Sequence, residues 1–421
     1  MAREIILQKL PVGWSYNLLD NIAERCSGHT PSKSFPEYWN GGIKWISLAD
    51  SCRLDKGYVY ETDKEISLEG IKNSSAEVHP AETVVLSRDA GVGKSGVMAT
   101  PMAVSQHFIA WKCDNKEKLH SWYLYNWLQL NKEEFERQAV GSTIKTIGLP
   151  YFKKLRIAVP PFDEQKKIAQ ILSTWDKAIS VTEKLLTNSQ QQKKALMQQL
   201  LTGKKRLLDE NGVRFSGEWE KGKFCDMANI DTGYAFKSKD FTQSDSGIPI
   251  IRMSDFKTGG LDVLGAAKVD RDSVNGLDKF KLRVGDFVFG MSGSLNNYGR
   301  VEKKDLPCYL NQRVGRILAK ECANQAFITY LYLSDSIQQS ILDKAAGAAQ
   351  LNISISDLRS MVVYYPCIEE QQKIAAVLSA ADAEISTLEK KLACLRDEKK
   401  ALMQQLLTGK RRVKVDEAVA E

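Results

Sequence analysis

An internal duplication constrains this chain more than any other feature of its sequence. Residues 193–204 read KKALMQQLLTGK, and the same letters return at residues 399–410, an offset of 206. At the same offset and without a gap, many residues between Glu164 and Leu186 are identical to their counterparts between Glu370 and Leu392. The parts upstream are less alike, although Trp14, Gly28, Gly42, Ile43 and Asp50 still match Trp219, Gly233, Gly247, Ile248 and Asp255 at an offset of 205. The ends of the two copies therefore do one job twice, while the preceding parts are free to differ.

The similar ends have the pattern of long helices. Prolines stand before each start, Asp163 and Glu369 sit near the caps, and Gly203 and Gly409 follow each end. Apolar residues then recur at alternating spacings of four and three, which predicts a coiled-coil seam. The seam residues are 168, 172, 175, 179, 182, 186, 189, 193, 196 and 200 in the first copy and 374, 378, 381, 385, 388, 392, 395, 399, 402 and 406 in the second.

Two copies of one unit tend to pack around a two-fold axis, which makes the helices antiparallel. The first helix, expected from Asp163 to Leu201, would span roughly 58 Å at about 1.5 Å per residue. That length exceeds one DNA turn of about 34 Å. Lys193 and Lys399 fall on the seam, where we expect them to specify register rather than to contact DNA. The acidic residues of the repeats are expected on solvated faces beside the seam.

The diverged parts, which we call the first body (residues 12–158) and the second body (residues 217–364), mix short apolar runs with turn residues. Helices are expected at His120–Arg137 and Gln325–Lys344. Strands are expected at 43–46, 83–86 and 156–159, and again at 248–251, 286–289 and 361–364. The predicted fold class is α+β, with two mixed bodies related by a pseudo-two-fold axis and joined by an antiparallel coiled coil.

Composition and charge narrow the function classes. The net charge of +7 suits a polyanionic partner. The sequence has no apolar run near the roughly 20 residues of a membrane span, and its start lacks a signal-peptide pattern. We therefore expect a cytoplasmic protein without disulfides. The eight cysteines form no Cys-x-x-Cys pair and the four histidines all precede Ser121, so no metal site is expected.

Several motifs resemble one protein family. Glu164-Gln165-Lys166-Lys167-Ile168-Ala169 after a double proline, both Leu-Leu-Thr-Gly-Lys helix ends, Ser27-Gly28-His29-Thr30-Pro31 and Gly141-Ser142-Thr143-Ile144 resemble the specificity subunits of type I restriction-modification systems. In the second body, Gly233 to Ser238, Gly285 to Phe289 and Asn311-Gln312-Arg313 are similar to another variant of that family. The resemblance covers nearly the whole chain. Ala348-Ala349-Gln350 and the single proline after Tyr365 depart from it.

The resemblance implies a non-catalytic subunit that reads an interrupted DNA site. Residues 1–158 and 208–364 would each recognise one half of the interrupted site on double-stranded DNA. Residues 159–207 and 365–421 would form the conserved helices. Two modification subunits, which are adenine methyltransferases, and two restriction subunits would dock around the helices. This chain would need no cofactor, because S-adenosylmethionine, ATP and Mg would be bound by those partners. The alternative is a coiled-coil scaffold without DNA specificity.

Side-chain chemistry nominates the DNA contacts. Guanine favours Arg or Lys, adenine favours Asn or Gln, and phosphates favour Lys, Arg, Ser or Thr on loops. The nominated residues are Thr30, Lys33, Arg88, Lys94, Gln106, Lys145 and Thr146 in the first body and Lys237, Ser238, Arg252, Ser292, Asn296, Asn297, Arg300, Gln312 and Arg313 in the second. The alternative for each is a plain surface residue, and Gln106 and Gln312 could instead stabilise a turn.

Three enzymatic interpretations are not supported by the residues or by their spacing. Gly91-Val92-Gly93-Lys94-Ser95 resembles the end of a phosphate-binding P-loop, but Arg88 stands where the earlier glycine is needed. Val159-Pro160-Pro161-Phe162 resembles an adenine-methylase tetrapeptide, but valine cannot accept the hydrogen bonds of the target amine. The scattered histidines His29, His79, His107 and His120 favour structural or surface roles over a nuclease centre.

Overall fold

The protein is described here by a computed structural model. The structure describes residues 10–113, 117–257, 260–292, 297–345 and 354–415. The chain forms two compact units, one made of residues 1–183 and 390–421 and the other of residues 184–389. Each unit therefore combines one body with a segment from each of the two long helices.

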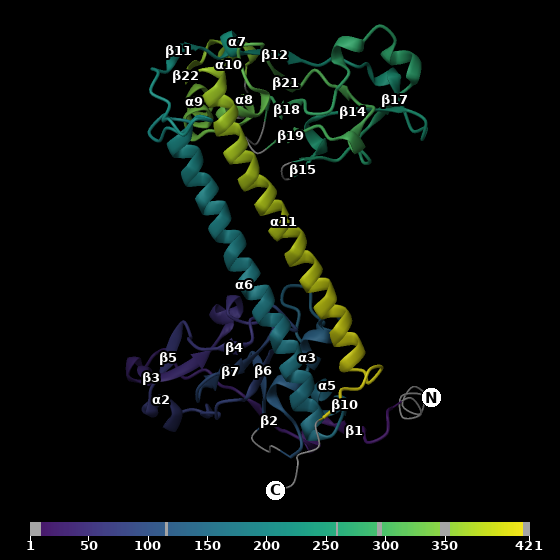
Figure 1. The fold of residues 1–421 in the computed structure, drawn as a ribbon. Coiled ribbons are helices and arrows are strands. Elements are labelled where there is room, and N and C mark those ends of the chain that lie inside the picture. The colour runs from purple at the N-terminus through teal and green to yellow at the C-terminus, as the bar shows by residue number, and fades with distance from the viewer. Residues whose placement is uncertain (1–9, 114–116, 258–259, 293–296, 346–353, 416–421) are drawn as a thin grey trace. The chain divides into compact units, whose positions relative to one another are not determined.

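The two long helices are α6 (Phe162–Leu200) and α11 (Ile368–Leu406), both unbroken in Figure 1. In the first unit, Lys399 Nζ lies 2.5 Å from Asp176 and Arg396 lies 2.7 Å from Glu183. In the second unit, Lys193 Nζ lies 2.5 Å from Asp382. In the first unit, Asp176 of α6 contacts Lys399 of α11, whereas the later residue Glu183 contacts the earlier residue Arg396. The two helices are therefore antiparallel there. Every predicted seam residue is buried or half-buried, which confirms the coiled coil and the seam position of both lysines.

The first unit is built around a five-stranded sheet of order β2-β9-β6-β7-β4, with a three-stranded sheet β5-β3-β8 and a pair β1-β10 beside it. Helix α3 packs on the larger sheet, and its core extends to Ile168 and Leu406 of the long helices. The strands are β1 (Ser15–Leu18), β2 (Glu24–Ser27), β3 (Trp39–Ile46), β4 (Tyr58–Val59), β5 (Lys64–Ile66), β6 (Val84–Ser87), β7 (Ser95–Met98), β8 (Ala103–Val104), β9 (Phe108–Lys112) and β10 (Arg156–Val159), and the helices are α2 (Leu68–Lys72), α3 (Ser121–Leu130), α4 (Lys132–Gln138) and α5 (Leu149–Lys153).

The second unit repeats this plan with a four-stranded sheet of order β12-β21-β18-β19. A second sheet has the order β13-β17-β14-β20, and β15-β16 and β11-β22 form pairs. The strands are β11 (Glu220–Lys223), β12 (Ala228–Thr232), β13 (Phe241–Thr242), β14 (Ile248–Ile251), β15 (Phe256–Lys257), β16 (Gly260–Leu261), β17 (Lys268–Val269), β18 (Phe287–Gly290), β19 (Tyr298–Arg300), β20 (Tyr309–Leu310), β21 (Val314–Ala319) and β22 (Val362–Tyr365), and the helices are α7 (Phe224–Met227), α8 (Gln325–Tyr332), α9 (Asp335–Ala345) and α10 (Ile355–Ser360).

These elements confirm the predicted α+β class and all six predicted strands to within a few residues. The two predicted body helices are each broken once. Asn131 leaves the helical conformation between α3 and α4, and α8 and α9 are separated at residues 333–334. No helix in the described part of the chain is long and apolar enough to cross a membrane.

A buried glutamine at the start of each long helix holds the neighbouring body. Gln165 accepts a hydrogen bond from the His120 N–H at 2.9 Å and donates to the Pro160 carbonyl at 3.0 Å. Gln371 likewise accepts from the Asn324 N–H at 3.1 Å and donates to Pro366 at 2.9 Å. His120 and Asn324 are the N-cap residues of α3 and α8. The same residue type therefore fixes the equivalent helix in both bodies.

A buried glutamate beside each of these glutamines corrects one expectation. Glu164 is 2% exposed and Glu370 is 0% exposed, so these acidic residues of the repeats do not lie on solvated faces. Arg412 donates to both Glu164 oxygens at 2.7 and 2.8 Å, and Arg206 donates to both Glu370 oxygens at 2.7 and 2.6 Å. Each glutamate is buried because an arginine beyond the end of the other long helix neutralises it.

Candidate nucleic-acid interface

One edge of the five-stranded sheet gathers most residues nominated in the first body. Strands β2 and β6 end at this edge and β7 and β9 begin there, because these neighbours are antiparallel. Thr30 follows β2 and its hydroxyl bonds the Gln106 side chain in the turn before β9. The loop at residues 140–147 joins the same edge, since the Ile147 N–H donates to the Arg88 carbonyl at 2.9 Å. Thr30, Arg88, Gln106 and Thr146 are thus brought together.

A histidine and an aspartate that sequence reasoning missed lie at the centre of this edge. His107 Nδ1 is 2.8 Å from Asp89 Oδ2, and Arg88 Nε lies 3.7 Å from the other Asp89 oxygen. The buried Arg88 Nε has no hydrogen-bond partner among the described residues. A signal was available, because the offset of 206 that pairs Gln106 with Gln312 also pairs His107 with Arg313.

The remaining nominees of the first body have other surroundings. The Lys94 ammonium donates to Ser51 Oγ at 2.9 Å, and the loop at Gly91 leads into strand β7, whereas a P-loop leads into a helix. Lys33 lines a separate cavity of about 280 Å³ with Trp39, Asn40 and Lys64. Lys145 is exposed in the loop that bears Thr146.

The equivalent edge of the second body holds Gln312 and Arg313, which are both exposed. The Gln312 N–H donates to the Tyr234 carbonyl at 3.0 Å, and the Met291 N–H donates to the Arg313 carbonyl at 3.1 Å. Ser292 follows Met291, and the Asn297 carbonyl accepts from the Gly290 N–H at 2.7 Å. Gln312, Arg313, Ser292 and Asn297 are therefore neighbours, whereas Asn296 lies outside the described residues.

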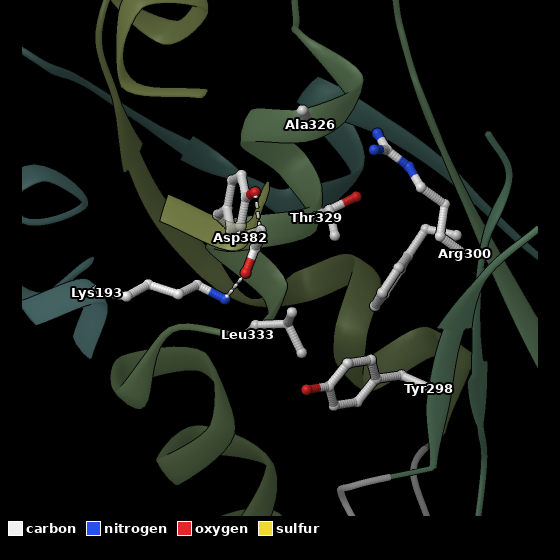
Figure 2. Close-up of a pocket in the computed structure, with 9 residues that line it drawn as sticks. Lys193, Tyr298, Arg300, Ala326, Thr329, Leu333 and Asp382 are labelled. Carbon is white, nitrogen blue, oxygen red and sulfur yellow. Dashed lines mark hydrogen bonds and ion pairs between the residues drawn. The ribbon is translucent and has the colours of Figure 1, made fainter. Parts of the chain in front are cut away.

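Lys237, Ser238, Arg252 and Arg300 are placed differently. Lys237 and Ser238 are exposed at the start of a short turn that Asp240 caps through the Lys237 N–H at 2.9 Å. Arg252 begins a similar turn, and its Nε lies 3.5 Å from the buried Asp255 carboxylate. Arg300 faces a cavity next to the long helices, shown in Figure 2.

The two bodies share the backbone contact that builds this edge. A Cβ added to Gly28 would lie 1.9 Å from the Val104 carbonyl oxygen, and one added to Gly233 would lie 2.0 Å from that of Leu310. The His29 N–H donates to Val104 at 3.0 Å, and the Tyr234 N–H donates to Leu310 at 2.9 Å. The duplicated glycines therefore serve close packing of two chain segments rather than an unusual φ angle.

We expect Gly28→Ala and Gly233→Ala each to lower the free energy of unfolding by about 1–3 kcal/mol. The new methyl group would overlap the backbone of a neighbouring segment, which cannot change rotamer as a side chain can. Urea unfolding of the purified chain measures this change. Gly217→Ala is the control, since an added Cβ there has no atom within 4 Å. Equal stability of all three variants would contradict the assigned contact.

Two of the remaining histidines, His79 and His120, have structural surroundings, whereas His29 is exposed. His79 is 0% exposed, and burial lowers its pKa. His120 caps α3, and burial lowers its pKa as well. Both side chains therefore favour the neutral form, which is consistent with structural roles.

Comparison with known proteins gives the family. The model of the type I restriction modification DNA specificity domain matches twice, at residues 11–188 and 216–395. The MjaVIII specificity subunit of Methanocaldococcus jannaschii is 27% identical over 85% of this chain and 87% of its own length. The EcoKI specificity subunit of Escherichia coli is 24% identical over 91% of this chain and 85% of its own.

Solved structures support the fold. The crystal structure of an S subunit of a type I restriction-modification system from M. genitalium matches with a TM-score of 0.58 and 16% identity, and covers 95% of this chain and 96% of that one. The two ranges matched by the family model, 11–188 and 216–395, contain the sheet edges described above. The chain belongs to the family of type I restriction-modification DNA specificity subunits, which recognise DNA targets.

Proposed function

We propose that this chain reads a two-part DNA site, one half through each body, while catalytic subunits dock on its helices. The observation that carries the proposal is the pair of equivalent sheet edges. Both are built on the same glycine contact and carry a glutamine at the same place, Gln106 or Gln312, but the next residue is His107 in one and Arg313 in the other. A shared frame with different polar groups suits two different half-sites.

The nominated side chains have the chemistry for this reading. Gln106 and Gln312 can pair with adenine through two hydrogen bonds, and the exposed Arg313 can pair with guanine. In the first body, Arg88, Lys145 and Thr146 belong to the same edge as Gln106 and suit phosphates. Lys33, Lys94, Lys237, Ser238 and Arg252 remain proposed contacts outside the two edges.

The helices offer two matching surfaces for partner subunits. Residues 193–204 and 399–410 are identical, and the match includes the exposed Gln199 and Gln405. Packing within the chain does not require identity at exposed positions, so a surface used twice accounts for it. We propose that modification subunits occupy these surfaces, that restriction subunits join them, and that the partners bind S-adenosylmethionine, ATP and Mg.

The purified chain is expected neither to transfer methyl groups nor to hydrolyse ATP. Co-expression with its modification subunit should methylate adenines within one interrupted sequence, which sequencing of the host DNA detects. Methylation by the isolated chain would contradict its non-catalytic role. A complex that methylates without sequence preference would favour the scaffold alternative.

We expect the length of α6 to set the gap between the half-sites. Repeating Gln199-Leu200-Leu201-Thr202 before Gly203 adds about 6 Å and roughly 40° beyond one helical turn. One DNA base pair adds about 3.4 Å and roughly 35°. The preferred gap should therefore lengthen by one or two base pairs, with both half-site sequences unchanged.

Sequencing of methylated sites in hosts expressing either form measures this gap. A four-residue insertion at Gly212, an open turn with no atom within 4 Å of an added Cβ, is the control and should leave the gap unchanged. An unchanged gap in the helix variant would mean that the partner subunits set the distance.

A further inference from the structure

A cavity of about 240 Å³ lies in the second unit between the sheet, α8 and the long helices. Figure 2 shows Tyr298 and Arg300 on one strand, facing the helix that carries Ala326 and Thr329. Asp382 closes one side, where it accepts a hydrogen bond from the Tyr330 hydroxyl at 2.6 Å and pairs with Lys193. Burial raises the pKa of Tyr330 to about 12, so this hydroxyl stays protonated and donates.

The same place in the first unit is filled. Helices α3 and α8 begin one residue after their caps, His120 and Asn324, so Trp122 corresponds to Ala326 and Tyr125 to Thr329. The Trp122 and Tyr125 rings lie 5.3 Å apart in the first body. The second body has small side chains at both positions, and the cavity occupies the space of the missing rings.

A strand also covers this place in the first body. Segment 55–59 pairs with β7: the Val97 N–H donates to the Gly57 carbonyl at 3.0 Å, and the Asp55 N–H donates to the Ser95 carbonyl at 2.8 Å. Strand β4 is parallel to β7, and its Tyr58 ring packs edge-to-face against Trp122, with ring centroids 4.9 Å apart. The fifth strand thus brings an aromatic ring to the helix.

On the side of β19 away from β18, no strand pairs with it among the described residues. The hairpin β15–β16 packs against β19 without pairing with it, and a Cβ added to Gly299 would lie 3.1 Å from the Gly260 carbonyl carbon. The Gly290 N–H donates to Asn297 and the Val301 N–H donates to Asp286, so alternate residues of β19 face β18. Tyr298 and Arg300 fall between them, and their backbone groups point away from β18. These two residues are the counterparts of Ser95 and Val97, whose backbone groups bind β4.

We propose that an extended segment of a partner polypeptide adds to β19 in parallel, as β4 adds to β7, and places an aromatic side chain in this cavity. The exposed Arg300 has no ion pair among the described side chains, so the segment carries an acidic residue beside the aromatic one. Strand addition supplies affinity through the backbone, and the cavity supplies specificity. A partner that docks alike on both halves would not need this site, because the first body has filled it. The occupant therefore binds once per chain.

The test uses the full chain and a fluorescent, end-capped peptide with the sequence of residues 54–61, LDKGYVYE, carrying two changes. Tyr58→Trp fills the larger space, and Lys56→Glu supplies the acidic residue on the same face of the strand as the aromatic one. Fluorescence anisotropy should show saturable binding. We expect at least tenfold weaker binding to Ala326→Trp, which rebuilds the packing of the first body. Arg300→Pro should weaken binding similarly by removing the outward N–H, and proline is tolerated on the free side of an edge strand. Arg300→Lys and Thr329→Ser are the matched controls, and circular dichroism verifies folding of each variant.

Absence of saturable binding to the wild-type chain would overturn the proposal. Equal binding to Ala326→Trp would do the same, since it would place the peptide elsewhere, including at the first body's own β4 site. A peptide with N-methylated backbone amides that binds as well as the original would exclude strand addition. These readouts do not involve DNA or methylation, so their failure leaves the proposed function intact.

Discussion

Exchanging residues 14–158 for the equivalent body of another specificity subunit should replace one half of the recognised DNA sequence and leave the other half unchanged. The nominated side chains of the first edge, from Thr30 to Thr146, all lie within the exchanged segment. The first body's core contains Trp111 and Tyr123, whereas the second body's core contains Phe287 and Tyr332, and the two clusters share no residue. Bodies with separate cores can be replaced one at a time.

The measurement is a map of methylated sites in hosts that express the parent and the hybrid with the same modification subunit. The reciprocal exchange of residues 219–364 is the control and should alter the other half-site. A hybrid that assembles normally but changes both halves would refute the assignment of one half-site to each body.

Arg206→Met should lower the free energy of unfolding by about 3 kcal/mol. Its partner, Glu370, is 0% exposed, so the substitution leaves a buried carboxylate without its cation. The same change at Arg412 should cost less, because the Arg412 side chain is 42% exposed and is better screened by water. Urea unfolding followed by circular dichroism measures both effects.

Arg411→Met is the control, since Arg411 is exposed next to Arg412. Adding Glu370→Met to Arg206→Met should restore much of the lost stability, because a buried ion pair can be replaced by apolar groups at little cost. Failure of this second substitution to restore stability would show that Arg206 acts through packing rather than charge.

The long helices could be predicted because their signals are local. Prolines and glycines mark their ends, and the seam repeats within each helix, so the expected start at Asp163 lies one residue from the observed Phe162. The breaks at Asn131 and at residues 333–334 have weaker signals, since the apolar periodicity continues across them.

The rest depends on partners distant in sequence. Glu164 resembles a solvated helix-start residue until Arg412, 248 positions away, is placed beside it. The sequence predicts a structural or surface role for His107, and only the folded chain places it beside Asp89, 18 positions away. The nominated residues could be chosen by chemical type. Only strand pairing shows that Thr30, Arg88 and Gln106 share one edge of the first body, and that Arg300 lies away from the equivalent edge of the second body.

The glutamine at the start of each long helix has a consequence for how such proteins evolve. Among the described residues, the Gln165 side chain bonds only main-chain atoms of residues 118, 120 and 160, and the Gln371 side chain bonds only those of residues 322, 324 and 366. A joint of this kind does not depend on which side chains the body carries. Mutations that alter DNA preference can therefore accumulate in a body without compensating mutations in the helices. The helix surfaces that we propose for the catalytic subunits then remain constant while the recognised sequence drifts.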